Sequence, residues 1–119
     1  MSYTQGISSE LEDLIFLEDV EASMLFRIDG NVVESCFNEK YSQELLRTVL
    51  WCKANVEKVS LEMRSNNLNK VTYELNDFCV LFFVVNSVTI LTTLANQNVN
   101  LSLLSIEAKR KSQIIANYL

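Results

Sequence analysis

The side chains that most often do chemistry are scarce in this 119-residue chain. It has no histidine, which is the commonest general base and the commonest metal ligand in proteins. Its three cysteines, Cys36, Cys52 and Cys79, are far apart and show no C-x-x-C spacing, so a zinc site is not expected. No activating base stands beside them for a thiol nucleophile. The sequence therefore predicts a protein that is not an enzyme and has no metal or cofactor, with a thiol enzyme as the least favoured function.

Two charged clusters could in principle bind ions. Glu10, Glu12 and Asp13 could hold a cation, but Ser9 with Glu12 fits a helix capping box, which favours a solvated first helical turn. Residues 109–111, Lys-Arg-Lys, form the only basic run, and they fall in a helical pattern whose solvated face they would occupy. Neither of the two glycines belongs to a phosphate-binding loop.

Composition and charge restrict the class of protein further. A chain of this length with 49% apolar residues is expected to form one domain over residues 1–119. The net charge is −5 and no basic stripe is present, so nucleic acid is not an expected partner. No secretory signal is visible, and the longest apolar run, eight residues, is too short to span a membrane. The odd number of cysteines favours free thiols, and we expect a cytoplasmic protein.

Three strands follow one another closely in the second half of the chain. They cover residues 68–75, 78–85 and 88–95, joined by Asn76-Asp77 and Asn86-Ser87. Two-residue connections predict neighbouring antiparallel strands. The middle strand is apolar at every position, so helices must cover both faces of the sheet.

The first half of the chain predicts a helix and a hairpin. The helix is expected from about Ser9 to Glu18. Asp29-Gly30 separates two apolar-rich segments, residues 23–28 and 31–37, which predicts a hairpin with a type I′ turn. This turn would place Met24 opposite Ser35, Leu25 opposite Glu34, Phe26 opposite Val33 and Arg27 opposite Val32.

Two more helices are expected from 3.6-residue periodicity. A long helix begins near Glu39 and ends at Asn66-Asn67, and its apolar stripe consists of Tyr41, Leu45, Val49, Cys52, Val56, Val59 and Met63. A last helix of about twenty residues is capped by Asn98 or Asn100. The side of it that faces inward would carry Leu101, Leu104, Ala108, Ile115 and Leu119.

Two features point to an interaction surface. In the strand of residues 69–75, Val71, Tyr73 and Leu75 alternate with polar residues, as in a half-buried strand near the edge of a sheet. The long helix carries more apolar residues than its stripe: Leu46 and Leu50 lie on one flank, and Trp51 lies on the other. Either a wide groove buries them all, or they cover a second subunit or partner; the second interpretation is favoured.

The order helix, hairpin, long helix, three-stranded meander and helix resembles the roadblock/dynein light chain family, which includes roadblock-like regulators of Ras-like GTPases. Residues 22–35, ASMLFRIDGNVVES, resemble the first hairpin of that family. Residues 88–95, VTILTTLA, followed by a polar segment and a leucine-led helix, resemble its C-terminal strand and helix. The family usually has glycine around the last turn and before the final helix, where this chain has Asn86-Ser87 and Asn98.

The resemblance implies an α+β sandwich. Its five-stranded antiparallel sheet would have the order 2-1-5-4-3, with the long helix on one face and the terminal helices on the other. Members of the family dimerise by joining their third strands, with their long helices side by side. For this chain, that implies a dimer interface made by the strand at 69–75 and the helix at 41–63. The candidate residues for the dimer or partner interface are Leu46, Leu50, Trp51, Val71, Tyr73 and Leu75.

Two functions remain open at this point. The first is a non-catalytic homodimeric scaffold that binds a small Ras-like GTPase or a multiprotein complex, although a heterodimer with a paralogue would fit the same pattern. The second is a sensory domain similar to longin or profilin folds, with a small ligand bound between helix and sheet.

Overall fold

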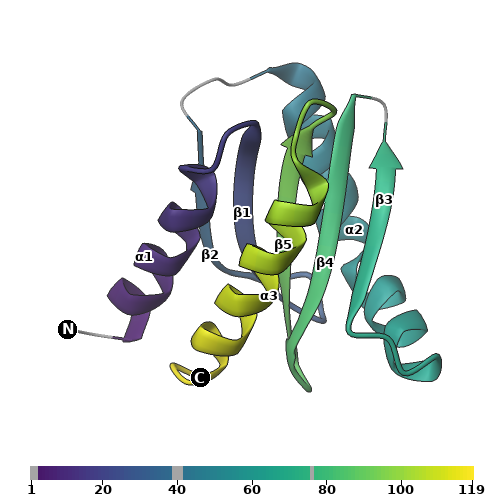
Figure 1. The fold of residues 1–119 in the computed structure, drawn as a ribbon. Helices are drawn as coiled ribbons and strands as arrows, with labels where there is room; N and C mark the ends of the chain where they lie inside the picture. The colour runs from purple at the N-terminus through teal and green to yellow at the C-terminus, as the bar shows by residue number, and fades with distance from the viewer. Residues whose placement is uncertain (1–2, 39–41, 76) are drawn as a thin grey trace.

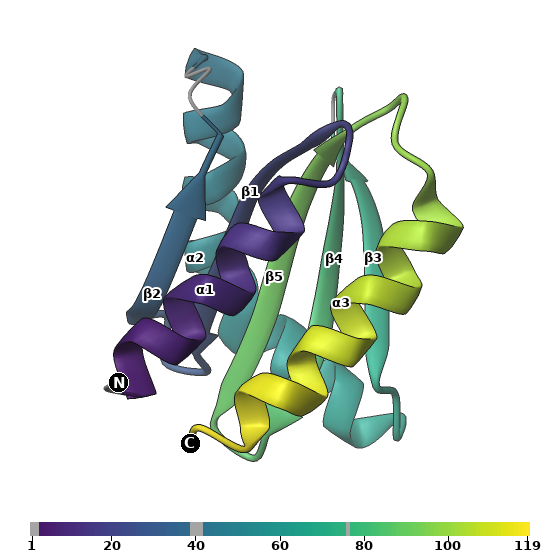
Figure 2. The same ribbon diagram turned by 60° about the vertical axis from the view of Figure 1, so that its left-hand side comes forward.

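The computed structural model describes residues 3–38, 42–75 and 77–119 (Figure 1). The elements are α1 (Tyr3–Ile15), β1 (Val20–Arg27), β2 (Val32–Phe37), α2 (Gln43–Ser65), β3 (Lys70–Leu75), β4 (Phe78–Asn86), β5 (Thr89–Asn96) and α3 (Leu101–Ala116). Within these residues, five strands form one antiparallel sheet in the order β2-β1-β5-β4-β3. Helix α2 covers one face, and α1 and α3 cover the other (Figure 2). The predicted α+β sandwich and its sheet order are confirmed.

Alternate residues of β4 contribute to two separate cores. Cys79, Leu81 and Phe83 pack with buried side chains of α1 and α3. Val80 and Phe82 pack on the other face, with buried side chains of α2. A strand covered on both faces needs an apolar residue at every position, which explains the uninterrupted apolar run in the sequence.

Helix α1 begins earlier than predicted. It starts at Tyr3 and ends at Ile15, so Ser9 lies inside the helix and does not cap it. Ile7, Leu11 and Leu14 share one side of the helix and are buried against the sheet. The packing of Ile7 extends the helix toward the N-terminus, and tertiary contacts outweigh the local capping signal.

The β1–β2 hairpin turns at Asp29-Gly30, but the turn type differs from the prediction. Gly30 has a φ of 94°, whereas Asp29 is not in the positive-φ region that a type I′ turn requires. The Gly30 N–H donates to the Arg27 carbonyl at 2.9 Å, and the Arg27 N–H donates to the Asn31 carbonyl at 2.8 Å. These bonds close a three-residue connection in which only the glycine is left-handed.

The longer connection changes the pairing near the turn. Met24 pairs with Ser35 and Leu25 with Glu34, as predicted. Phe26 pairs with Val32, so the predicted Phe26–Val33 and Arg27–Val32 pairs are wrong. A bulge after Leu25 accommodates the extra residue of β2.

Helix α2 carries the predicted stripe. Its buried side chains include Leu45, Cys52, Val56, Val59 and Met63, while Val49 is half-buried. The Ser42 hydroxyl accepts a hydrogen bond from the Leu45 N–H at 3.0 Å and caps the helix. Tyr41 and the expected start near Glu39 lie outside the described residues, as does Asn76 in the β3–β4 turn.

The β4–β5 turn and α3 differ slightly from the prediction. The turn lies at Ser87 and Val88, because Asn86 still pairs with Thr89. Helix α3 has 16 residues and is capped by Asn100, whose side chain accepts from the Leu103 N–H. The inward residues Leu104, Ala108 and Ile115 are buried as predicted. Leu101 and Leu119 are exposed, because the first begins the helix and the second follows its end.

One residue of the basic run on α3 pairs with two residues of the acidic cluster on α1. The Lys111 ammonium donates to Glu10 Oε2 at 2.5 Å and to Asp13 Oδ2 at 2.7 Å, and the Lys111 side chain is buried. The prediction of a solvated first turn was wrong in its position, because residues 10–13 lie inside α1, and the prediction of a solvated basic face was wrong for Lys111. Lys109 and Arg110 are exposed, as expected.

Candidate functional site

Strand β3 forms one edge of the sheet. Among the described residues, its only strand neighbour is β4. The Val84 N–H donates to the Asn69 carbonyl at 3.1 Å, which makes Asn69–Val84 a hydrogen-bonded pair. Hydrogen-bonded and non-hydrogen-bonded pairs alternate in an antiparallel ladder, so the backbone N–H and C=O groups of Lys70, Thr72 and Glu74 point outward. These groups are free to pair with another strand.

The side chains of β3 alternate as the sequence predicts. Val71, Tyr73 and Leu75 are half-buried and pack with the core under α2. Lys70, Thr72 and Glu74 are exposed. Because Val71, Tyr73 and Leu75 already contact their own domain, β3 offers a partner mainly its backbone edge.

Aromatic rings connect β3 to α2. The ring centroid of Trp51 lies 5.4 Å from that of Tyr73, in an edge-to-face arrangement, and Phe82 lies 5.9 Å from Tyr73. Burial and the nearby Glu62 carboxylate raise the pKa of the Tyr73 hydroxyl above its usual value. Trp51 and Glu62 are eleven residues apart, about three helical turns, so the same flank of α2 faces β3 at both positions.

A second side of α2 carries exposed leucines. Leu46, Leu50 and Leu61 are 52%, 56% and 52% exposed. Leu50 directly precedes Trp51 and Leu61 directly precedes Glu62, so the leucines lie about 100° around the helix from the β3-facing flank. We refer to Leu46, Leu50 and Leu61 as the leucine stripe.

The structure divides the six predicted interface residues into two groups. Trp51 and Tyr73 contact each other, and Val71 and Leu75 pack into the same core under α2. Leu46 and Leu50 lie on the other, exposed side of the helix. Leu61 was not among the predicted residues, although its spacing of eleven residues from Leu50 is a signal for the same side of a helix.

The thiols are poor nucleophiles in this structure. Burial raises the pKa of Cys52 to about 12. Burial also raises the pKa values of Cys36 and Cys79, with contributions from neighbouring glutamates. All three thiols are therefore protonated at neutral pH. The described residues also contain no group of three or more cysteine or carboxylate side chains placed to hold a metal ion.

The helices of the described residues do not meet the requirements for crossing a membrane, because none of them is both long and apolar enough.

The sequence itself matches a known family. The model of the AF0774-like protein family matches residues 4–109, which is most of the chain. The chain belongs to the AF0774-like protein family. No curated protein matches it in sequence.

Solved structures show which fold this AF0774-like protein shares. MglC from Myxococcus xanthus has a TM-score of 0.81 at 10% identity, over 93% of this chain and 97% of that chain. The gliding protein MglB from Thermus thermophilus has a TM-score of 0.81 at 10% identity, over 99% and 91%. A Roadblock/LC7 domain from Streptomyces avermitilis has a TM-score of 0.72 at 14% identity, over 93% and 95%. The predicted resemblance to the roadblock fold is confirmed; at these identities, the likeness shows the fold alone.

Proposed function

We propose that this AF0774-like protein is a non-catalytic, cytoplasmic homodimeric module that binds a small Ras-like GTPase or a larger complex. The observation that carries this proposal is the open edge of β3 beside the Trp51–Glu62 flank of α2. The free, protonated thiols are consistent with a reducing compartment and with the absence of thiol chemistry.

The dimer would form by pairing β3 with the β3 of a second copy. The outward backbone groups are those of Lys70, Thr72 and Glu74, so Thr72 is at the centre of the available edge. A twofold axis beside Thr72 would pair the two strands antiparallel, and neither β3 would remain an open edge. Trp51 is half-buried on the adjacent flank of α2 and would lie near the seam. A solved MglB structure described as having a tetrameric arrangement supports self-association through this fold.

The leucine stripe is the proposed surface for the GTPase. Its three leucines are exposed in the single chain and lie about 100° around α2 from the flank that faces β3, so we expect pairing of β3 to leave them exposed. Exposed apolar side chains grouped on one side of a helix are typical of protein interfaces. The Ras-like class of partner follows from the resemblance to roadblock-like regulators.

Light scattering during gel filtration tests the first half of this proposal. The expected mass is about twice the 13.6 kDa of the chain at micromolar concentration. A protein that remains monomeric at this concentration would contradict the homodimer.

Capture of partners from a native lysate tests the second half. The wild-type dimer should retain a small GTP-binding protein, and Leu50→Asp should lose it while remaining dimeric. Leu103→Asp on α3 is the matched control, because Leu103 is also an exposed leucine, at 46%, but lies on the other face of the molecule. Loss of the GTPase from both variants, or from neither, would show that the leucine stripe is not its binding surface.

The alternative of a longin- or profilin-like sensory domain is less well supported, because the element order and the solved structures both agree with the roadblock fold. A roadblock fold can also bind a small ligand, however. A groove on the α3 face favours such binding.

A further inference from the structure

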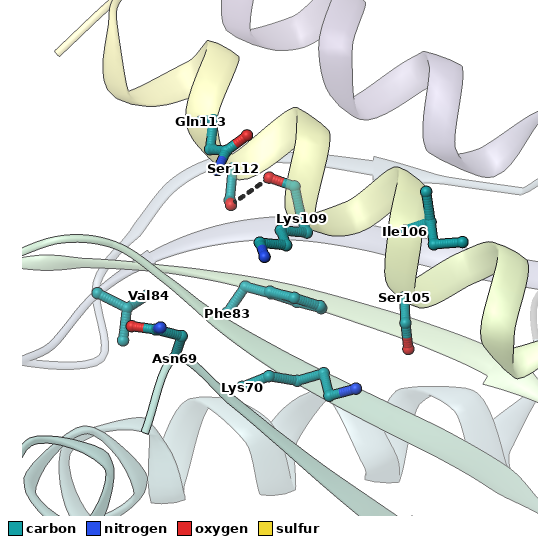
Figure 3. Close-up of a pocket in the computed structure, with 9 residues that line it drawn as sticks. All are labelled: Asn69, Lys70, Phe83, Val84, Ser105, Ile106, Lys109, Ser112 and Gln113. Atoms are coloured by element: carbon teal, nitrogen blue, oxygen red, sulfur yellow. Dashed lines mark hydrogen bonds between the residues drawn. The ribbon is translucent and has the colours of Figure 1, made fainter. Parts of the chain in front are cut away.

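A groove lies between α3 and the β3–β4 hairpin, on the sheet face opposite α2 (Figure 3). Helix α3 packs on β4 and β5, and β3 extends beyond it (Figure 1). The resulting groove has a volume of about 440 Å³, within the range of small-molecule sites. It shares only Lys70 with the proposed interfaces: the backbone of Lys70 belongs to the β3 edge, and its side chain lines the groove.

The groove has an apolar base and wall. Phe83 of β4 is only 4% exposed, so its ring is fixed by the core. Ile106 contributes to the α3 wall although it is 64% exposed, whereas the side chain of Val84 packs with the core under α2 on the other face of the sheet. An isoleucine this exposed beside a hollow can gain contacts from an apolar group bound there.

The polar residues that line the groove are Asn69, Lys70, Ser105, Lys109, Ser112 and Gln113, and the two lysines are its charged groups. Lys70 of β3 and Lys109 of α3 line opposite walls, and Figure 3 shows the Lys109 side chain reaching from α3 toward Phe83. The Lys70 ammonium points toward the end of the groove that Ser105 lines. Within the described residues, neither lysine takes part in an ion pair or side-chain hydrogen bond, unlike Lys111 and Arg110 on the same helix. Two unpaired cations therefore line one hollow in a chain whose net charge is −5.

We propose that this groove binds a small organic anion. Its apolar body would rest on Phe83 and Ile106, and its carboxylate or phosphate would be attracted by the ammonium groups of Lys70 and Lys109 on the two walls. Lysine binds either anion as a compact charge with three donors, so the two lysines do not choose between them. This site goes beyond the proposed function and does not depend on dimerisation or on a GTPase.

Three probes with one ring system test the proposal on the full chain. 1-Naphthyl phosphate, 1-naphthoate and neutral 1-naphthol are titrated by calorimetry, and the amide shifts of Phe83, Val84 and Ser105 are followed by NMR. Both anions should bind at the groove, and 1-naphthol should bind at least about threefold more weakly. Tighter binding of the phosphate would identify a phosphate ligand, and tighter binding of the carboxylate a carboxylate ligand.

Matched lysine variants distinguish this site from general charge attraction. Lys70→Met and Lys109→Met should each weaken binding of the preferred anion about threefold or more, while Lys53→Met on α2 should leave it unchanged. Equal binding of 1-naphthol and the anions, equal effects of all three variants, or amide shifts confined to α2 would overturn the proposal. A hexaglutamate peptide is the last probe. If it binds more tightly than both anions and loses binding in the same two lysine variants, the groove binds an acidic protein segment and the proposal is overturned.

Discussion

The buried ammonium of Lys111 on α3 forms ion pairs with α1. Its partners Glu10 and Asp13 are 101 and 98 residues away in the sequence. Burial alone would lower the pKa of Lys111, but the hydrogen bonds to Asp13 and Glu10 outweigh burial and raise it above its ordinary value. Sequence patterns of charge describe one helix at a time, so this contact between helices could not be predicted from them.

Replacing Lys111 tests the importance of this contact. Lys111→Met leaves the Glu10 carboxylate, whose side chain is only 16% exposed, without its cation. We expect the free energy of unfolding in urea to fall by about 1–3 kcal/mol, with Asp13 contributing less because its side chain is 53% exposed.

The exposed neighbour gives the control for this substitution. Lys109→Met should change the free energy of unfolding by no more than about 0.5 kcal/mol. If the two variants are equally stable, the ion pairs of Lys111 do not hold α1 in place.

The candidate interface residues were found from the sequence only in part. The 3.6-residue period of α2 shows which residues lie off the buried stripe, and this identified Leu46, Leu50 and Trp51. It does not show which flank faces β3, because this depends on the position of the helix over the sheet. The Trp51–Tyr73 ring contact, at 5.4 Å between centroids, provides that information.

Among the elements, β4 was the most predictable and the β1–β2 turn the least. The apolar run of β4 has one explanation, which is burial on both faces of the sheet. In the structure, side chains of β4 are buried on both faces. Asp29-Gly30 is compatible with more than one turn, since a glycine at positive φ is needed in two-residue and three-residue connections alike. The side chain of Asp29 selects the longer one, because its Oδ1 accepts from the Asn31 N–H at 3.0 Å.

The hairpin turn can be tested at Gly30. An added Cβ meets two obstacles there, a φ of 94° and the Lys53 carbonyl oxygen at 3.1 Å. We expect Gly30→Ala to lower the free energy of unfolding by about 1–2 kcal/mol. Gly30→Asn introduces the same Cβ but tolerates a left-handed backbone better, so its loss in urea unfolding should be smaller. Equal losses would mean that the contact with Lys53 dominates and the backbone conformation does not.

For the whole molecule, burial of thiols makes stability depend on pH. The Cys52 thiol ionises near 9.0 in the unfolded chain, and burial raises its folded pKa to about 12. The contribution of this buried thiol to the free energy of unfolding is thus complete below pH 9 and is lost as the pH rises toward 12. Over this range, the free energy of unfolding falls by about 1.4 kcal/mol per pH unit.

Urea unfolding at several alkaline pH values checks this dependence. The free energy of unfolding should fall more steeply with pH in the wild type than in Cys52→Ala. Cys36 and Cys79 titrate in both proteins, so the difference between the two slopes reports on Cys52. Identical slopes would contradict the effect of burial on this thiol.

Three surfaces of the molecule are proposed to bind three different partners. The β3 edge is the proposed site for a second copy, the leucine stripe of α2 for a GTPase, and the groove beside α3 for a small anion. The dimer is the central claim, because the edge strand is the feature that both the sequence pattern and the sheet topology identify.

The most direct test of the dimer is a proline at Thr72. The Thr72 N–H points away from β4, so Thr72→Pro removes no hydrogen bond from the sheet but blocks pairing with a second β3. Thr72→Val retains the backbone N–H and is the matched control. Light scattering should give about twice 13.6 kDa for the wild type and Thr72→Val, and 13.6 kDa for a Thr72→Pro variant that still unfolds cooperatively. A folded Thr72→Pro variant that keeps the dimer mass would contradict association through β3.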